Sequence, residues 1–99
     1  MLLITGTFRL PLEMLDEAWA VMQVMIEASQ EEEGCLAYSY AQDLLEPGLI
    51  RVNEAWRDAE ALDEHFASEH LEEWRANWER LGIHGRDLTL FEVSQAKPV

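Results

Sequence analysis

The chain has 99 residues, of which 48% are hydrophobic and 27% are charged. This composition is ordinary for a globular protein and argues against disorder, and the length suits one domain with one core. Twenty acidic residues against seven basic ones give a net charge of −13. Such a surface repels phosphate backbones and anionic lipid, which excludes nucleic acid and membrane surfaces as preferred partners.

We expect one domain over residues 1–99, with residues 94–99 as a loose tail. Cys35 is the single cysteine, so no intrachain disulfide can form, as is typical of a reducing compartment. The first residues, MLLITGTF, have no basic region and no long apolar run, unlike a signal peptide. The sequence therefore predicts a cytoplasmic protein.

The first half of the chain has the pattern strand, helix, strand. Leu2–Leu10 alternates apolar and polar side chains, as a half-buried strand does. Pro11 opens a helix whose apolar stripe runs to about Glu33, and we expect Gly34 to be its left-handed cap. Cys35–Leu44 returns to alternation and is the second predicted strand.

The second half has the pattern strand, helix, strand. Leu49–Arg57 is predicted to pair with the preceding strand as a hairpin through a turn at residues 46–48. Asp58 is a good N-cap for a second helix, and Ser68 restarts that helix. Leu88–Val93 is a short last strand.

The resulting order, β-α-β-β-α-β, predicts an α+β, ferredoxin-like fold. In this fold an antiparallel four-stranded sheet carries both helical segments on one face and leaves the other face bare.

The two faces of the expected sheet differ in character. The helix-facing side is bulky and apolar, with Ile4, Phe8, Leu36, Tyr38, Tyr40, Val52 and Trp56. The opposite side is small and mildly polar, with Thr5, Thr7, Cys35, Ala37, Ser39, Asn53 and Ala55. A face that met only water would usually carry more charge, so we expect a second copy to pack on it as a homodimer. A simply solvated face is the alternative.

Glu54 is the most informative residue of the helix-facing side. It alternates in phase with Trp56, so it points inward, where a carboxylate needs a partner. His65, on the apolar stripe of the second helix, is the expected partner. With Tyr38 and Tyr40 these residues would line a pocket in which the pair could act as a base. A purely structural pair that orients the helix is the alternative.

The sequence predicts no metal site. His65 and His70 are five residues apart, which does not place them on one helix face, and His84 falls in a predicted loop. Cys35 has no basic neighbour to activate it, so we expect it to be buried rather than nucleophilic.

Two stretches, Glu31–Asp43 and Asn53–Trp74, resemble the antibiotic-biosynthesis-monooxygenase domain family. The matching motifs are Glu33-Gly34-Cys35, Tyr38, Glu54-Ala55-Trp56, Ala61-Leu62, His65 and the segment His70 to Trp74. The resemblance implies a dimeric α/β barrel, in which two such sheets pack face to face. It also implies a small monooxygenase that oxidises a phenol or quinol with O2 and uses no flavin, haem or metal.

The resemblance also implies which residues form the site. Glu54 and His65 match the recurring acid and histidine and are the expected catalytic residues. The expected substrate contacts are Trp56, Tyr38, Tyr40, Val52, Phe66 and Trp74. Val52 stands where some oxygenases of the family carry an asparagine, and Asn53 is one residue out of phase with that position.

Two other functions fit the same fold. A non-catalytic cavity protein would bind a small ligand without turning it over. A haem-degrading relative would need an asparagine on the first strand and a histidine ligand near Trp74, where this chain has Thr5, Thr7 and only His70 nearby.

Overall fold

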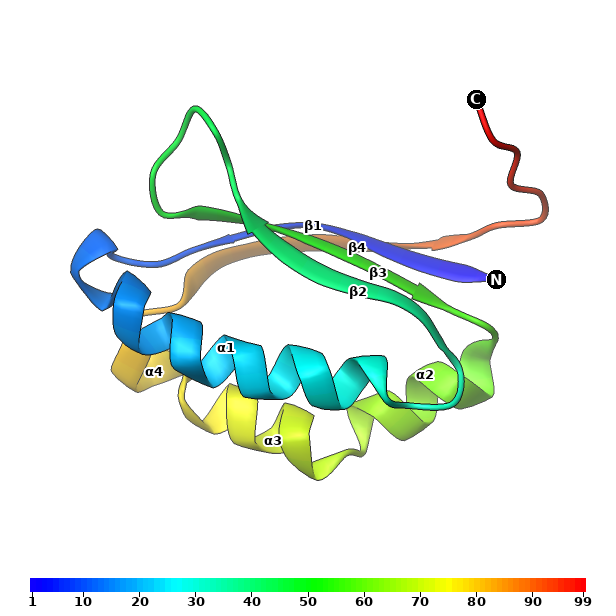
Figure 1. Cartoon of the computed structure of the whole chain (residues 1–99), viewed down its shortest axis with the longest axis horizontal. Coiled ribbons are helices and arrows are strands. Elements are labelled where there is room, and N and C mark those ends of the chain that lie inside the picture. Colours follow the sequence, from blue (N-terminus) through cyan, green and yellow to red (C-terminus); the bar gives the residue numbers. More distant parts are fainter.

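The computed structural model describes residues 1–99 and contains one four-stranded antiparallel sheet (Figure 1). The strands are β1 (Leu2–Arg9), β2 (Cys35–Gln42), β3 (Leu49–Trp56) and β4 (His84–Glu92). They lie in the order β2-β3-β1-β4. This order and the connections between the strands are those of the ferredoxin-like arrangement, which confirms the predicted α+β class.

The helices all lie on one face of the sheet (Figure 1). They are the 3-10 turn η1 (Leu12–Met14) and the α-helices α1 (Leu15–Gln30), α2 (Ala59–Phe66), α3 (Glu69–Ala76) and α4 (Trp78–Leu81). The predicted caps are confirmed, because the side chain of Asp58 accepts from the Ala61 N–H and that of Ser68 accepts from the Leu71 N–H. None of these helices is long and apolar enough to cross a membrane.

The first helix ends earlier than predicted. α1 stops at Gln30 and a turn follows, and Gly34 does not have the left-handed conformation that we expected of it. Gly34 is needed for a different reason, since a Cβ there would lie 2.1 Å from the Cβ of Ala61 on α2. This close approach brings the turn after α1 against the start of α2, and it positions Glu32.

The start of β2 corrects the predicted faces. The pairing of β2 with β3 shifts between Cys35 and Ala37, as in a β-bulge. The side chain of Leu36 is therefore exposed (56%), whereas Cys35 packs against the core and not on the open face. Burial raises the pKa of the Cys35 thiol. Beyond the bulge the expected alternation holds, and Tyr38 is buried.

β4 is longer than the predicted strand and includes His84, for which the sequence predicts a loop. It pairs with β1 along the edge of the sheet, and its side chains are mostly exposed. An exposed edge strand has no alternating apolar pattern, so its first residues could not be recognised from the sequence.

The core lies between the sheet and the helices. Trp56 and Leu81 are completely buried, and Trp74 and Met25 are only 2% exposed. Around them pack the buried apolar residues Ile4, Phe8, Leu10, Ala18, Met22, Tyr38, Ile50, Val52, Ala61, Leu62 and Leu71. β3 supplies the middle of this core, as its inward alternation of Ile50, Val52, Glu54 and Trp56 predicted.

The opposite face of the sheet is covered by no helix (Figure 1). Short polar side chains cross it in one row, because Ser39 pairs with Asn53, Asn53 with Thr5, and Thr5 with Thr89. This row has the small, mildly polar character that the sequence predicted, whereas the next row along the strands runs from Ala37 and Ala55 to the larger apolar side chains of Leu3 and Phe91.

Candidate functional site

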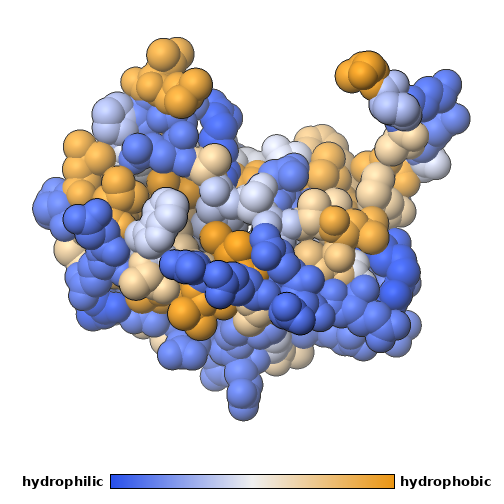
Figure 2. Space-filling view, viewed as in Figure 1, coloured by the Kyte–Doolittle hydropathy of each residue, from blue (hydrophilic) through white to orange (hydrophobic).

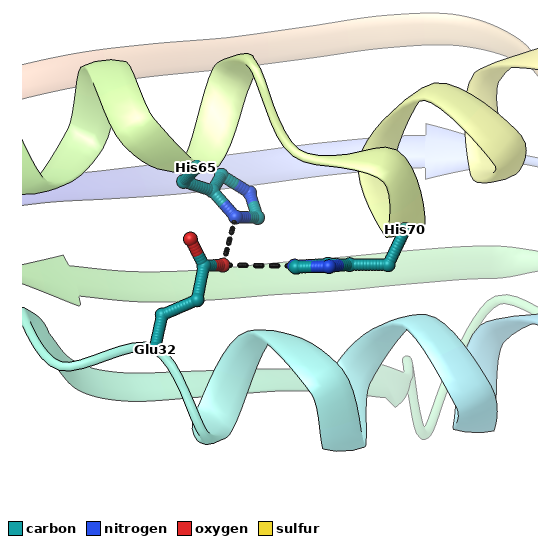
Figure 3. A group of neighbouring side chains, drawn as sticks. All are labelled: Glu32, His65 and His70. Atoms are coloured by element: carbon teal, nitrogen blue, oxygen red, sulfur yellow. Dashed lines mark hydrogen bonds and ion pairs between the residues drawn. The ribbon is translucent and has the colours of Figure 1, made fainter.

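Three side chains that the sequence did not place together meet beside the core (Figure 3). Glu32 lies in the turn after α1, His65 on α2 and His70 on α3. One carboxylate oxygen, Oε2 of Glu32, is 2.7 Å from Nδ1 of His65 and 2.9 Å from Nε2 of His70. Both imidazoles thus point at the same oxygen atom.

The break between α2 and α3 makes this convergence possible. In one continuous helix, positions five residues apart point about 140° away from each other. Here Ser68 separates the helices: its hydroxyl donates to the His65 carbonyl at 2.6 Å, and it caps α3 by accepting from the Leu71 N–H. Our reason for excluding a shared site for His65 and His70 was therefore wrong.

His65 is almost completely buried, with 1% exposure. Its ring packs 4.5 Å from that of Trp56 and 5.3 Å from that of Tyr38, measured between centroids. Burial lowers the pKa of His65, and the hydrogen bond with Glu32 opposes this shift. A neutral imidazole donates from one nitrogen and accepts at the other. With Nδ1–H donated to Glu32, Nε2 carries the free lone pair.

Glu54 is also buried, as predicted, but its hydrogen-bond partner differs from the expected one. Its Oε1 accepts from the indole Nε1–H of Trp56 at 3.0 Å and lies 3.9 Å from Nε2 of His65, beyond hydrogen-bond reach. Burial raises the pKa of Glu54, and the bond from Trp56 partly opposes this. Glu54 and His65 are neighbours, and each is held by a different third residue.

A cavity opens next to these groups. It holds about 40 Å³ and is lined by the predicted site residues Tyr38, Tyr40, Val52, Glu54, His65, Phe66 and Trp74, with others from β1, α3, α4, β4 and the loop before β4. Trp56 is not among the lining residues; it is fully buried behind Glu54. The volume is far below the roughly 300–1,000 Å³ of a typical small-molecule pocket.

The hydroxyl groups of Tyr38 and Tyr40, which line this cavity, are potential hydrogen-bond donors. Their hydroxyl oxygens are 3.3 Å apart. Burial raises the pKa of Tyr40 to about 12 and raises that of Tyr38 further. Both phenols therefore stay protonated at neutral pH and can donate hydrogen bonds.

Sequence reasoning missed Glu32 and two arginines. The family resemblance pointed to the adjacent Glu33, whose side chain is 90% exposed; only the turn geometry distinguishes the two. Arg75 and Arg86 also line the cavity, and Arg86 lies 4.4 Å above the ring of Trp78. No sequence signal marks these arginines among the exposed charges.

A second, larger hollow of about 340 Å³ lies between α1 and β2. In Figure 2, hydrophobic surface gathers there and at the tip of the β2–β3 hairpin, in contrast to the hydrophilic helical side. Its lining is mostly apolar, with Leu15, Trp19, Met22, Ile26, Tyr40, Ala41 and Ile50 beside Gln23, Glu27, Gln30 and Gln42. Trp19 is 65% exposed, and Tyr40 borders both hollows.

The fold is shared with several solved structures. One is a proposed antibiotic biosynthesis monooxygenase of Deinococcus radiodurans. It superposes with a TM-score of 0.92 at 23% identity, covering 100% of this chain and 98% of that one. Rv0793 of Mycobacterium tuberculosis superposes with a TM-score of 0.85 at 23% identity, covering 98% of each chain.

A sequence relative is the uncharacterised protein sll1783 of Synechocystis, 25% identical over 96 residues. The alignment covers 97% of this chain but 65% of the relative, so the chain spans about two thirds of that protein's length. The family model described as antibiotic biosynthesis monooxygenase matches residues 1–77. The chain belongs to the antibiotic biosynthesis monooxygenase family.

Proposed function

We propose that this protein oxidises a phenolic or quinol-type small molecule with O2, without flavin, haem or metal, and that His65 is the base. The observation that supports this most is the bond between Nδ1 of His65 and Glu32, 2.7 Å long. It fixes the imidazole and leaves the lone pair of Nε2 as an acceptor in a ring that borders the cavity. A carboxylate that orients a histidine base is a recurring catalytic arrangement.

In this proposal Nε2 accepts the hydroxyl proton of the bound phenol. The resulting phenolate is electron-rich enough to transfer an electron to O2, and the two radicals combine at a ring carbon. Loss of water then gives a quinone. One oxygen atom enters the ring, and the other leaves as water with the hydroxyl hydrogen and the ring hydrogen, so that phenol plus O2 gives quinone plus water.

The surrounding groups have supporting roles. Tyr38 and Tyr40 are both protonated; one hydroxyl donates to the other, which leaves one hydroxyl hydrogen to donate to the oxygen of the substrate, and Trp74 offers an apolar wall. Dry surroundings strengthen such interactions. Glu54, 3.9 Å from Nε2, is placed to stabilise the imidazolium that forms.

An aromatic substrate requires more room than about 40 Å³. The half-exposed ring of Phe66 and the side chain of Arg75 above it stand at the edge of the cavity. We expect these side chains to move aside when substrate binds.

The test is oxygen uptake by metal-free protein with a panel of hydroquinones and polycyclic phenols. Wild type should consume oxygen saturably, and His65→Ala and Glu54→Gln should be slower while each keeps a cooperative unfolding transition in urea, which shows that the buried site has not unfolded. His84→Ala is the matched control, because this histidine lies outside the cavity on β4. The proposal fails if no compound supports uptake, or if the His65 variant is as fast as the His84 variant.

The hollow between α1 and β2 favours a second candidate function, binding of an apolar ligand without chemistry. This site has the volume of a small-molecule pocket, and Glu27 and Tyr40 are its only ionisable groups. Ligand-induced change in Trp fluorescence that Trp19→Phe abolishes, with no oxygen uptake, would support this function over the first.

We also propose that the protein acts as a homodimer through the open face of the sheet. Small side chains such as Ser39, Asn53 and Thr5 let a second sheet approach closely. A second copy would cover the face that the helices leave bare.

A further inference from the structure

We propose that Glu32, His65 and His70 form a binding site for a divalent transition-metal cation of the Zn²⁺ type. The site lies next to the cavity, on the side of His65 that faces Glu32 (Figure 3). A metal site goes beyond the proposed oxidation, which needs no metal. Whether the site binds a cation does not depend on whether that reaction occurs.

The three donor atoms lie near enough to one another for small side-chain movements to form a metal site. They lie within 4.8 Å of one another and come from three different elements. Around a cation with bonds of about 2.0–2.2 Å, neighbouring donor atoms are roughly 3–3.5 Å apart. The present separations of 2.7 and 2.9 Å from Oε2 of Glu32 are slightly shorter.

A small withdrawal of Glu32 therefore makes room for the cation between the three groups. This residue can move, because it lies in the turn after α1 and its long side chain is 18% exposed. The hydrogen atoms now shared between Glu32 and the two histidines would give way to the cation.

The donor set indicates which cation fits. Two imidazoles with one carboxylate suit Zn²⁺ and its first-row neighbours, whereas Mg²⁺ and Ca²⁺ prefer oxygen donors alone. The exposure of Glu32 and His70, 18% and 21%, leaves one side open for entry and for a water ligand. The net charge of −13 favours cations near the surface.

Glu54 lies behind His65 and is the nearest carboxylate to its other ring nitrogen. A neutral imidazole that binds metal through Nδ1 carries its hydrogen on Nε2, and Oε1 of Glu54, 3.9 Å from that nitrogen, would have to approach it to accept that hydrogen. A carboxylate behind a metal-bound histidine is the usual outer partner in such sites.

Metal binding would move the ring hydrogen of His65 from Nδ1 to Nε2 and would thereby affect the oxidation, an effect that rests on the proposed function. With the metal on Nδ1, Nε2 has no lone pair to accept the proton of a phenol. The bound cation therefore inhibits the oxidation, and a chelator restores it.

The first test measures binding alone. Chelator-treated protein is titrated with Zn²⁺ by calorimetry and with Co²⁺ by its visible absorption, in wild type, Glu32→Gln and His70→Ala. Glu31→Gln and His84→Ala are the matched controls, since neither residue touches the site. His65→Ala is avoided because the side chain is fully buried and the variant could unfold.

Wild type and both controls should bind one equivalent equally well, and the two site variants at least about tenfold more weakly. Absence of binding to wild type, or equal binding by the site variants, would overturn the proposal and leave the cluster as hydrogen bonds only.

The second test separates this inference from the proposed function. If oxygen uptake occurs, Zn²⁺ should slow the uptake by wild type and EDTA should restore it. The oxygen uptake by His70→Ala should not be slowed by the same concentration of Zn²⁺. Metal binding at this site without any oxygen uptake would contradict the proposed oxidation and leave the metal site standing. If the protein binds Zn²⁺ but its oxygen uptake is unchanged by Zn²⁺, the proposed inhibition is wrong.

Discussion

Oε2 of Glu32 lies 2.7 Å from Nδ1 of His65, although the two residues are 33 positions apart in the chain. The contact links the turn after α1 to the buried face of α2. Any role of His65, as a base or as a ligand, depends on this carboxylate, because it fixes both the direction of the ring and the nitrogen that carries the hydrogen.

We predict that Glu32→Ala lowers the free energy of unfolding by about 1–3 kcal/mol, because the buried Nδ1–H of His65 loses its acceptor. Urea denaturation followed by Trp fluorescence measures this. Glu31→Ala, one residue earlier and exposed, should stay within about 0.5 kcal/mol of wild type. Equal losses in the two variants would contradict a special role for Glu32.

Glu54→Gln should be more stable than wild type at neutral pH. The pKa of Glu54 is raised by burial above its ordinary 4.5, so the folded state holds this proton more tightly than the unfolded state. Its contribution to stability is therefore greatest below pH 4.5 and falls as pH rises through the folded pKa. Gln does not titrate and can still accept from Trp56.

Urea denaturation of wild type and Glu54→Gln, from below pH 4.5 to neutral pH, measures the effect. The advantage of the Glu54 variant should grow from acid to neutral pH. A difference that stays constant with pH would contradict the raised pKa.

Gly34→Ala should lower the free energy of unfolding by about 1–3 kcal/mol through overpacking, since its Cβ would lie 2.1 Å from that of Ala61. Combination with Ala61→Gly should recover part of the loss. A double-mutant cycle on thermal unfolding measures this coupling. Purely additive losses would show that the close approach is not what requires glycine.

Ser68→Ala should lower the free energy of unfolding by about 0.5–2 kcal/mol, because it removes the N-cap of α3. The same change loosens the break that aims His70 at Glu32, so Co²⁺ affinity should fall with it. Ser94→Ala in the exposed tail is the control. Unchanged stability together with unchanged Co²⁺ binding would argue against the cap as the positioning device.

Ser39→Arg should convert a dimer to a monomer in sedimentation velocity, because it places a charge on the open face, halfway along the edge strand β2. Ala20→Arg, which adds the same charge on the exposed side of α1, should leave the sedimentation coefficient as in wild type. A monomeric wild type, or a dimer insensitive to the Ser39 variant, would rule out this interface.

The sequence by itself determined the order of elements, the inward position of Glu54 and the small side chains of the open face. These follow from local periods, two along a strand and 3.6 along a helix, which each segment displays without its neighbours. The family resemblance, too, rests on short motifs such as Glu54-Ala55-Trp56.

Only the tertiary structure decided that Glu32, His65 and His70 meet, that Leu36 turns outward and that the cavity holds about 40 Å³. The first two depend on local details of the backbone: α1 ends at Gln30, a break at Ser68 turns α3 away from α2, and β2 bulges between Cys35 and Ala37. Such a detail redirects a side chain to another face, and the contact of Gly34 with Ala61 shows that packing between distant segments sets it.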